Sequence, residues 1–169
     1  RADPEGEGRK RDGYWTAAHG KEERLMATIS IEMLTPERAE ELWPALEPMY
    51  ASACNSHEIA KDEMDANTIR ELARTGMCAV FVGFVDGEPT CTIAIQFNMT
   101  NGKKGADLIA MAGQHLLKFK AAYWDIILDW LRANEVEFLD AYIPAERTAM
   151  YQKKFGFDKS CAYVRKTLH

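Results

Sequence analysis

The sequence CAVFVGFVDGEPTCTIAIQFNM, residues 78–99, predicts a β-hairpin. Two runs rich in β-branched and aromatic residues, 78–85 and 90–99, flank the pair Asp86-Gly87. An Asp-Gly pair suits a two-residue turn in which both residues have positive φ, and such turns connect antiparallel strands. The hairpin therefore provides two adjacent strands in the middle of the chain.

The residues after the hairpin continue as strand, helix, strand, helix and strand. A turn at 101–105 precedes a third strand at 106–112. The next segment is an amphipathic helix that ends near Asn134, because its apolar residues recur at steps of three and four. These residues are Leu117, Ala121, Trp124, Leu128 and Leu131. The last three elements are a strand, a helix closed by a Phe-Gly-Phe turn, and a strand, at residues 136–143, 144–154 and 161–167.

The residues before the hairpin predict one strand and two helices. The alternating pattern of residues 27–34 indicates a strand, and Thr35-Pro36 then marks the start of a helix. This helix has apolar residues at helical spacing, namely Leu42, Leu46, Met49 and Ala53. Pro44 and Pro48 interrupt it, so we expect a kinked or two-part helix. A shorter helix follows at 65–75 and is stopped by a glycine.

The elements have the order β-α-α-β-β-β-α-β-α-β, which indicates a single α/β domain of the α+β type over residues 26–169. An antiparallel meander followed by a β-α-β unit predicts a central mixed, mostly antiparallel sheet with helices on both faces. The length of 169 residues is the usual size of one domain and is sufficient for a real core.

Residues 1–25 differ in composition from the rest of the chain. They are rich in Gly, Arg, Lys, Asp and Glu and have little apolar periodicity, so they cannot bury enough surface to offset their ordering entropy. We expect either a flexible tail or an upstream extension. The second alternative rests on Lys21-Glu22-Glu23, whose codons can form a purine-rich ribosome-binding sequence at a suitable distance before Met26. The intact mass of the protein from its native source distinguishes the two.

The composition argues against several classes of function. A net charge of −5 and a pI near 5.4 oppose general nucleic-acid binding, because phosphate binding needs a basic field. No two of the four cysteines form a C-x-x-C pair, so no zinc or other metal site is expected. No apolar run is long enough to span a membrane, and the polar N-terminus lacks the apolar segment of a signal peptide. We therefore expect synthesis in the cytoplasm.

Three C-terminal motifs resemble the GNAT superfamily of acyl-CoA N-acyltransferases. Residues 130–136 (WLRANEV), followed by 138–142 (FLDAY), are similar to the passage from its long helix to the next strand. Residues 147–157 (RTAMYQKKFGF) are similar to its closing helix and Gly-Phe turn. The resemblance covers residues 27–167 and implies the GNAT fold, acetyl-CoA as the acyl donor and an amine as the acceptor.

The cofactor loop departs from the family pattern. Active members have Gln/Arg-x-x-Gly-x-Gly/Ala, whose glycines let the backbone approach the cofactor pyrophosphate. An ungapped alignment places this motif at residues 115–120 (HLLKFK), so that Lys118 and Lys120 occupy both glycine positions while Gly113 lies nearby. One interpretation is a solvated first helical turn with no cofactor. The other is that His115, Lys118 and Lys120 bind an anion electrostatically.

The catalytic positions depart from the pattern as well. The family's general acid is a tyrosine four residues before the closing glycine, where this chain has Gln152. Tyr151 lies one residue earlier, rotated by about 100° on a helix. It packs in the core in one interpretation, and a helix shift makes it the general acid in the other. Glu88, Asp107 and His115 are candidate general bases by position only.

These departures are similar to those of a GNAT-like group, the small internal virion proteins of short-tailed phages. That resemblance implies a non-catalytic, virion-associated module that binds a protein partner and no cofactor, made in the host cytoplasm. The alternatives are an active N-acetyltransferase that uses acetyl-CoA, and a regulatory factor that binds acyl-CoA without turnover.

Two structural features distinguish these hypotheses. An open cleft between the predicted strands 106–112 and 136–143 favours an enzyme, whereas Lys118 and Lys120 filling that cleft opposes one. A binding module should expose an aromatic patch, and Trp130 is the tryptophan that falls off the apolar stripe of its helix.

Overall fold

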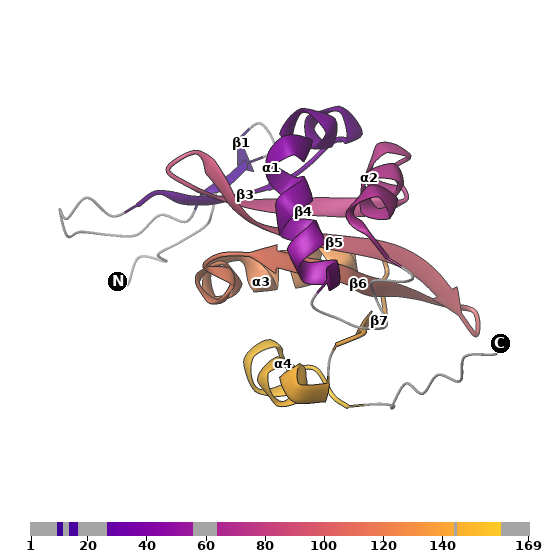
Figure 1. The fold of residues 1–169 in the computed structure, drawn as a ribbon. Coiled ribbons are helices and arrows are strands. Elements are labelled where there is room, and N and C mark those ends of the chain that lie inside the picture. The colour runs from indigo at the N-terminus through magenta and orange to yellow at the C-terminus, as the bar shows by residue number, and fades with distance from the viewer. Residues whose placement is uncertain (1–9, 12–13, 17–26, 56–63, 144, 160–169) are drawn as a thin grey trace, which may run out of the picture.

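The computed structural model describes residues 10–11, 14–16, 27–55, 64–143 and 145–159. In this part of the chain, one sheet lies between two layers of helices (Figure 1). The fold class predicted from the sequence is therefore confirmed.

Among the described residues, the sheet has seven strands whose spatial order equals their order in the chain. All neighbours are antiparallel except the last two, which are parallel. The strands are β1 (Lys10–Arg11), β2 (Tyr14–Thr16), β3 (Ile29–Met33), β4 (Cys78–Val85), β5 (Glu88–Thr100), β6 (Lys103–Gly113) and β7 (Phe138–Ala141). The first two strands lie within the segment predicted as a tail or upstream extension, and that prediction itself stays open. The strand predicted at 161–167 lies outside the described residues.

Both tight turns of the meander have positive φ at two consecutive residues, as expected at Asp86-Gly87, and the second turn is shorter than the predicted 101–105 because β6 begins at Lys103. Asp86 and Gly87 have φ values of 52° and 86° between β4 and β5. Asn101 and Gly102 have φ values of 53° and 77° between β5 and β6. Positive φ at both central residues gives the turn a twist that matches the twist of the flanking strands.

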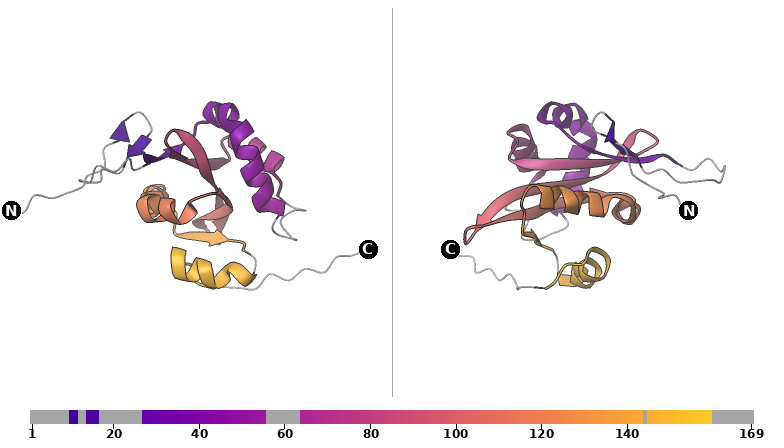
Figure 2. Two further views of the ribbon diagram at one scale, coloured as in Figure 1. Left: turned by 60° about the vertical axis from the view of Figure 1, so that its left-hand side comes forward. Right: turned by 180° about the vertical axis from the view of Figure 1, so that it is seen from behind.

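One face of the sheet is covered by α1 (Pro36–Asn55) and α2 (Ala66–Arg74), as both views of Figure 2 show. Of the two forms expected for the first helix, kinked or two-part, the two-part form is excluded because α1 is continuous through Pro44 and Pro48, and the kinked form stays a prediction. Its two prolines are exposed, so water can solvate the carbonyl groups that they leave without a helical partner. The apolar stripe is also rotated by one residue from the predicted one, and comprises Ala39, Trp43, Leu46, Tyr50 and Cys54.

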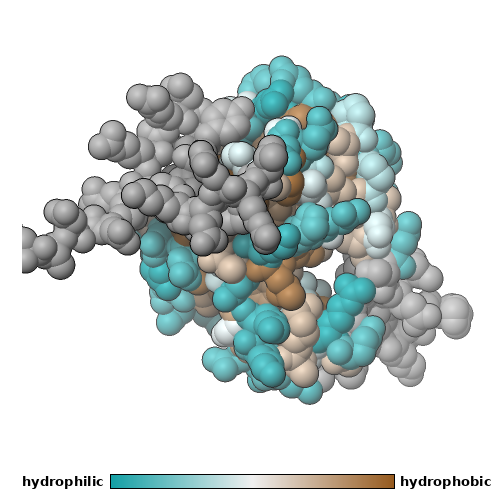
Figure 3. Space-filling model, turned by 90° about the vertical axis from the view of Figure 1, so that its left-hand side faces the viewer, coloured by the Kyte–Doolittle hydropathy of each residue, from teal (hydrophilic) through white to brown (hydrophobic). Residues whose placement is uncertain are grey.

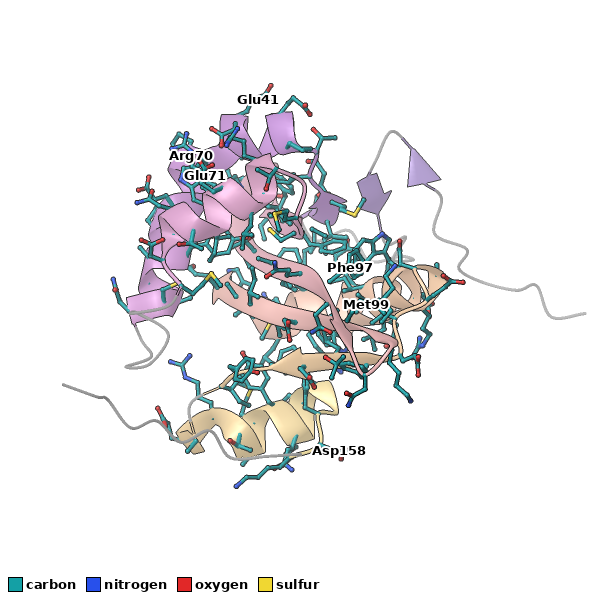
Figure 4. The ribbon with its side chains drawn as sticks, turned by 90° about the vertical axis from the view of Figure 1, so that its right-hand side faces the viewer. Glu41, Arg70, Glu71, Phe97, Met99 and Asp158 are labelled. Carbon is teal, nitrogen blue, oxygen red and sulfur yellow. The ribbon has the colours of Figure 1, made fainter. Side chains whose placement is uncertain are left out.

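An ion pair joins these two helices. The guanidinium of Arg70 on α2 donates three hydrogen bonds to the Glu40 carboxylate on α1, at 2.7, 3.0 and 3.2 Å. The same guanidinium lies 5.7 Å from the ring centroid of Trp43. Figure 4 shows Arg70 beside Glu71 on the helical layer, away from Phe97 and Met99 of β5.

The opposite face is covered by α3 (Leu116–Ala133) and α4 (Thr148–Phe155), with a short 3-10 helix η2 (Ala145–Arg147) before α4. The predicted stripe of α3 was partly wrong, because Leu117 is 52% exposed and Ala121 is exposed. The residues that α3 buries are Phe119, Tyr123, Trp124, Ile127 and Leu131. Aromatic and aliphatic side chains at this spacing bury a larger apolar area than the predicted set.

The core accordingly has two halves, one on each face of the sheet. In the view of Figure 3, hydrophobic residues reach the surface between hydrophilic layers above and below. None of the described helices is both long and apolar enough to cross a lipid bilayer.

Candidate active site

The sheet separates between β6 and β7. The two strands pair from Gly105 with Phe138 as far as Leu108 with Ala141, where β7 ends. Strand β6 continues to Gly113, so residues 109–113 have no strand partner on that side within the described chain. Backbone groups on an unpaired strand edge are the kind to which an extended ligand can bind.

A β-bulge lies at the point where the strands separate. On the β5 side, Leu108 pairs with Ile95 and Ala110 pairs with Ala94, which leaves Ile109 as an extra residue. A bulge interrupts the ladder and bends the strand, and bulges are common beside active sites. The bulge thus redirects the backbone of β6 where its edge becomes open.

A cavity of about 260 Å³ occupies this opening, and we call it the β6–β7 cleft. Residues 108–113 of β6 form one wall, Ser52 and Cys54 of α1 lie on one face of the sheet, and Arg147 and Tyr151 lie on the other. The walls of the cleft therefore come from elements on both faces of the sheet. This is the open cleft between the two strands that favours an enzyme.

Tyr151 is the sequence-predicted residue that the structure places most clearly in the cleft. Its side chain is buried, packs against Phe155 with ring centroids 5.3 Å apart, and lines the cleft. Gln152, at the family's usual position, is exposed and does not line it. Burial raises the pKa of Tyr151, and the charge of Arg147 partly opposes this shift. A phenol with a raised pKa stays protonated at neutral pH.

The predicted cofactor-binding residues divide into two groups. Gly113 lines the cleft, with a φ of 101°. A side chain at Gly113 would collide with the Thr90 carbonyl oxygen and with the Cys91 Cα, so this glycine is needed for packing against β5. His115 is the exposed N-cap of α3 and makes no side-chain capping bond. Gly113 is thus a cleft residue with a structural reason to be glycine.

The two lysines do not fill the cleft. Lys118 is exposed and is absent from the cleft walls. Lys120 is half-buried and lines a separate apolar cavity of about 10 Å³ beneath α3. Neither lysine side chain therefore occupies the β6–β7 cleft.

The candidate bases lie outside the cleft walls. Glu88 is exposed at the turn between β4 and β5. Asp107 is half-buried, accepts a hydrogen bond of 2.7 Å from the Asn98 side-chain amide, and lies in register with Asp140 of β7. It precedes the first cleft residue of β6, Leu108, by one position. His115 likewise precedes a cleft residue, Leu116, by one position, and the role of each candidate base stays a prediction.

Sequence reasoning missed Arg147. This residue lines the cleft from the junction of η2 and α4, one helical turn before Tyr151. The spacing of four residues within RTAMY could have indicated it, because residues i and i+4 share one face of a helix. The contribution of α1 to the cleft could not be read from its periodicity.

Trp130 is more accessible than the other large aromatic residues of the helices, as its place off the apolar stripe indicated. Trp43, Tyr50 and Trp124 are buried, whereas Trp130 is half-buried. Trp130 stacks on Phe97, which is 37% exposed, with ring centroids 5.5 Å apart. Figure 4 shows Phe97 close to Met99, near the turn that leads into β6. The expectation of a protein partner stays a prediction.

Comparison with known proteins gives similar structures only. No family model matches the sequence, and no curated protein matches it. An aminoglycoside acetyltransferase from an uncultured soil metagenomic sample has a TM-score of 0.62 at 11% identity, covering 84% of this chain and 99% of its own. A ribosomal-protein-alanine N-acetyltransferase from Brucella melitensis biovar Abortus 2308 has a TM-score of 0.56 at 15% identity, covering 84% and 99%.

A third similar structure contains an acyl donor. It is a predicted acetyltransferase with acetyl-CoA from Clostridium acetobutylicum, with a TM-score of 0.58 at 9% identity, covering 83% of this chain and 96% of its own.

These findings correct the leading functional expectation. A non-catalytic, virion-associated module was the wrong first choice, because the similar structures are acetyltransferases and the active N-acetyltransferase is the better supported alternative. The expectation that no cofactor binds is likewise unsupported, given the acetyl-CoA in one of them. At these low identities the likeness establishes architecture, and the chain has the fold of the GNAT acetyltransferases.

Proposed function

We propose that this protein is an N-acetyltransferase that transfers an acetyl group from acetyl-CoA to an amine. The observation that carries the proposal is the β6–β7 cleft, with an open strand edge on one side and the Tyr151 ring on the other. Lys118 and Lys120 lie in the first turns of α3 and do not line this cleft.

The cleft fits the chemistry of this donor. The pantetheine arm of CoA is an extended chain with two amide groups, and the free edge of residues 109–113 offers backbone donors and acceptors for such a chain. The CoA phosphates need cations or helix N–H groups, and both Arg147 and the start of α3 border the cleft.

Tyr151 and the open edge of β6 each have a role in the proposed reaction. Acetyl-CoA, when bound, supplies a thioester that an amine attacks, forming a C–N bond as the C–S bond breaks. Tyr151 holds a proton at its hydroxyl, because burial raises its pKa, and donates this proton to the departing sulfur. The open edge of β6 orients the donor, and its unpaired N–H groups stabilise negative charge on the carbonyl oxygen.

The acceptor enters from the α1 face, where Ser52 and Cys54 line the cleft. Asp107 lies on β6 next to this opening and receives the amine proton through one bridging water.

Calorimetry and thermal unfolding with acetyl-CoA test the proposal. We expect micromolar binding and a higher Tm in the presence of the ligand, because a ligand of the native state stabilises that state. A thiol-release assay with a panel of primary amines then tests transfer. Binding without transfer to any amine would favour the regulatory factor, and no binding at millimolar acetyl-CoA would overturn the proposal.

A further inference from the structure

Arg147 lines the β6–β7 cleft opposite β6, and no acidic group of the described chain forms an ion pair with it. Four arginines with described side chains form ion pairs, namely Arg38, Arg70, Arg74 and Arg132. Arg147 forms no ion pair with any residue that the structure describes. Its side chain is exposed and lines the cleft together with Gly113 and Leu116 at the start of α3.

We infer that Arg147 binds the phosphate groups of the acyl donor and replaces the glycine-rich loop that the chain lacks. This inference rests on the proposed function. A guanidinium can donate two parallel hydrogen bonds to phosphate oxygens, which fixes the orientation of the ligand as well as attracting its charge.

The position of Arg147 explains why the lysines are dispensable in this role. Lys118 and Lys120 begin α3 but do not line the cleft, whereas Arg147 reaches it from the opposite wall. Its charge also acts on the buried hydroxyl of Tyr151, one turn further along α4, and offsets part of the rise in pKa that burial causes. In this proposal, Arg147 lies between the CoA phosphates and the proton donor, Tyr151.

The test compares two ligands that differ in their phosphates. Binding of CoA and of acetyl-pantetheine is measured by calorimetry for the wild type, Arg147→Gln and Arg147→Lys. We expect Arg147→Gln to weaken CoA binding about tenfold or more and to change acetyl-pantetheine binding less than about twofold. The affinity of Arg147→Lys for CoA should lie between those of the wild type and Arg147→Gln, because lysine keeps the positive charge but cannot donate two parallel hydrogen bonds.

Lys154→Gln is the matched control, since Lys154 is an exposed cation on the adjoining helix α4 and does not line the β6–β7 cleft. It should bind both ligands as the wild type does. If the wild type binds CoA and Arg147→Gln binds it equally well, the inference fails while the proposed function stands. Equal weakening of both ligands by Arg147→Gln also overturns it, because the loss is then unrelated to phosphate. If the wild type binds no CoA, the proposed function and the inference fail together.

Discussion

The hydroxyl of Tyr50 on α1 lies 2.6 Å from the hydroxyl of Thr92 on β5, and both side chains are almost completely buried. Thr92 donates its own proton to the Phe81 carbonyl at 3.2 Å, so Tyr50 is the donor in the shorter bond. This chain of hydrogen bonds connects the longest helix to the centre of the sheet. The loss of Thr92 leaves the Tyr50 hydroxyl without its acceptor, whereas the loss of Tyr50 leaves Thr92 still bonded to the Phe81 carbonyl.

Tyr50→Phe should lower the free energy of unfolding by about 1–2 kcal/mol, because it removes one buried hydrogen bond. Thr92→Val should cost about 1–3 kcal/mol, since it leaves the Tyr50 hydroxyl without its acceptor. Urea denaturation measures both values. The double variant should lose less than the sum of the single losses, and strict additivity would show that the two hydroxyls do not interact.

The stability of the protein should fall at alkaline pH. Burial raises the pKa of Cys91 from 9.0 to about 12 and that of Cys78 from 9.0 to about 11. Above pH 9 the unfolded chain loses these protons and the folded chain keeps them, so rising pH favours unfolding. Each thiol should cost up to about 1.4 kcal/mol per pH unit until its folded pKa is reached.

Urea denaturation between pH 8 and 11 checks the thiol prediction. Cys91→Ala should have a shallower pH dependence than the wild type. Ile93→Val, a neighbouring buried change without a titratable group, should lose about 1 kcal/mol equally at every pH. An unchanged slope in Cys91→Ala would show that this thiol does not titrate differently in the two states.

Tyr151→Phe should lower kcat about 100-fold or more and leave the Kd for acetyl-CoA within about twofold, because the hydroxyl acts as proton donor rather than as a binding group. Gln152→Ala is the control, since Gln152 is exposed and lies outside the cleft. Steady-state kinetics with calorimetry measures both effects. A Tyr151→Phe enzyme with wild-type kcat would require another acid.

Two glycines separate crowding from backbone strain. Gly83→Ala places a Cβ 2.5 Å from the Phe119 ring and 2.6 Å from the Cys91 sulfur, and should cost about 1–3 kcal/mol. Gly102→Ala meets no atom within 4 Å but keeps a φ of 77°, so it should cost about 1–2 kcal/mol from strain alone. Urea denaturation of each variant measures these losses. Replacing the same glycines by Val should lower the free energy of unfolding further, and by much more at Gly83 than at Gly102.

The order of elements was predictable because it depends on local signals. The turn pairs at Asp86 and Asn101 and the glycine that follows α2 each require a positive φ that few residues adopt. Periodicity located the helices, but the buried face of α1 and of α3 was misjudged by part of a turn. Several apolar residues compete for the core at those positions, and packing against the sheet decides among them.

The site could be predicted only in part. The Tyr151 alternatives depended on the rotation of α4, which no local signal fixes, and the structure places the ring both in the core and at the cleft. Arg147 and Ser52 lie about 95 positions apart in the chain, and their common cavity arises from the parting of β6 and β7. That parting depends on a bulge and on the length of β7, which are properties of strand pairing rather than of composition.

Because the walls of the β6–β7 cleft come from both faces of the sheet, the proposed reaction should have a particular kinetic mechanism. In the proposed reaction, the donor binds along β6 and the acceptor approaches past α1, so neither substrate has to dissociate before the other binds. Both then occupy the enzyme in one ternary complex, without an acetylated enzyme in between. Double-reciprocal plots at several fixed donor concentrations should intersect, and a molecule that joins an amine to pantetheine should exclude both substrates at once.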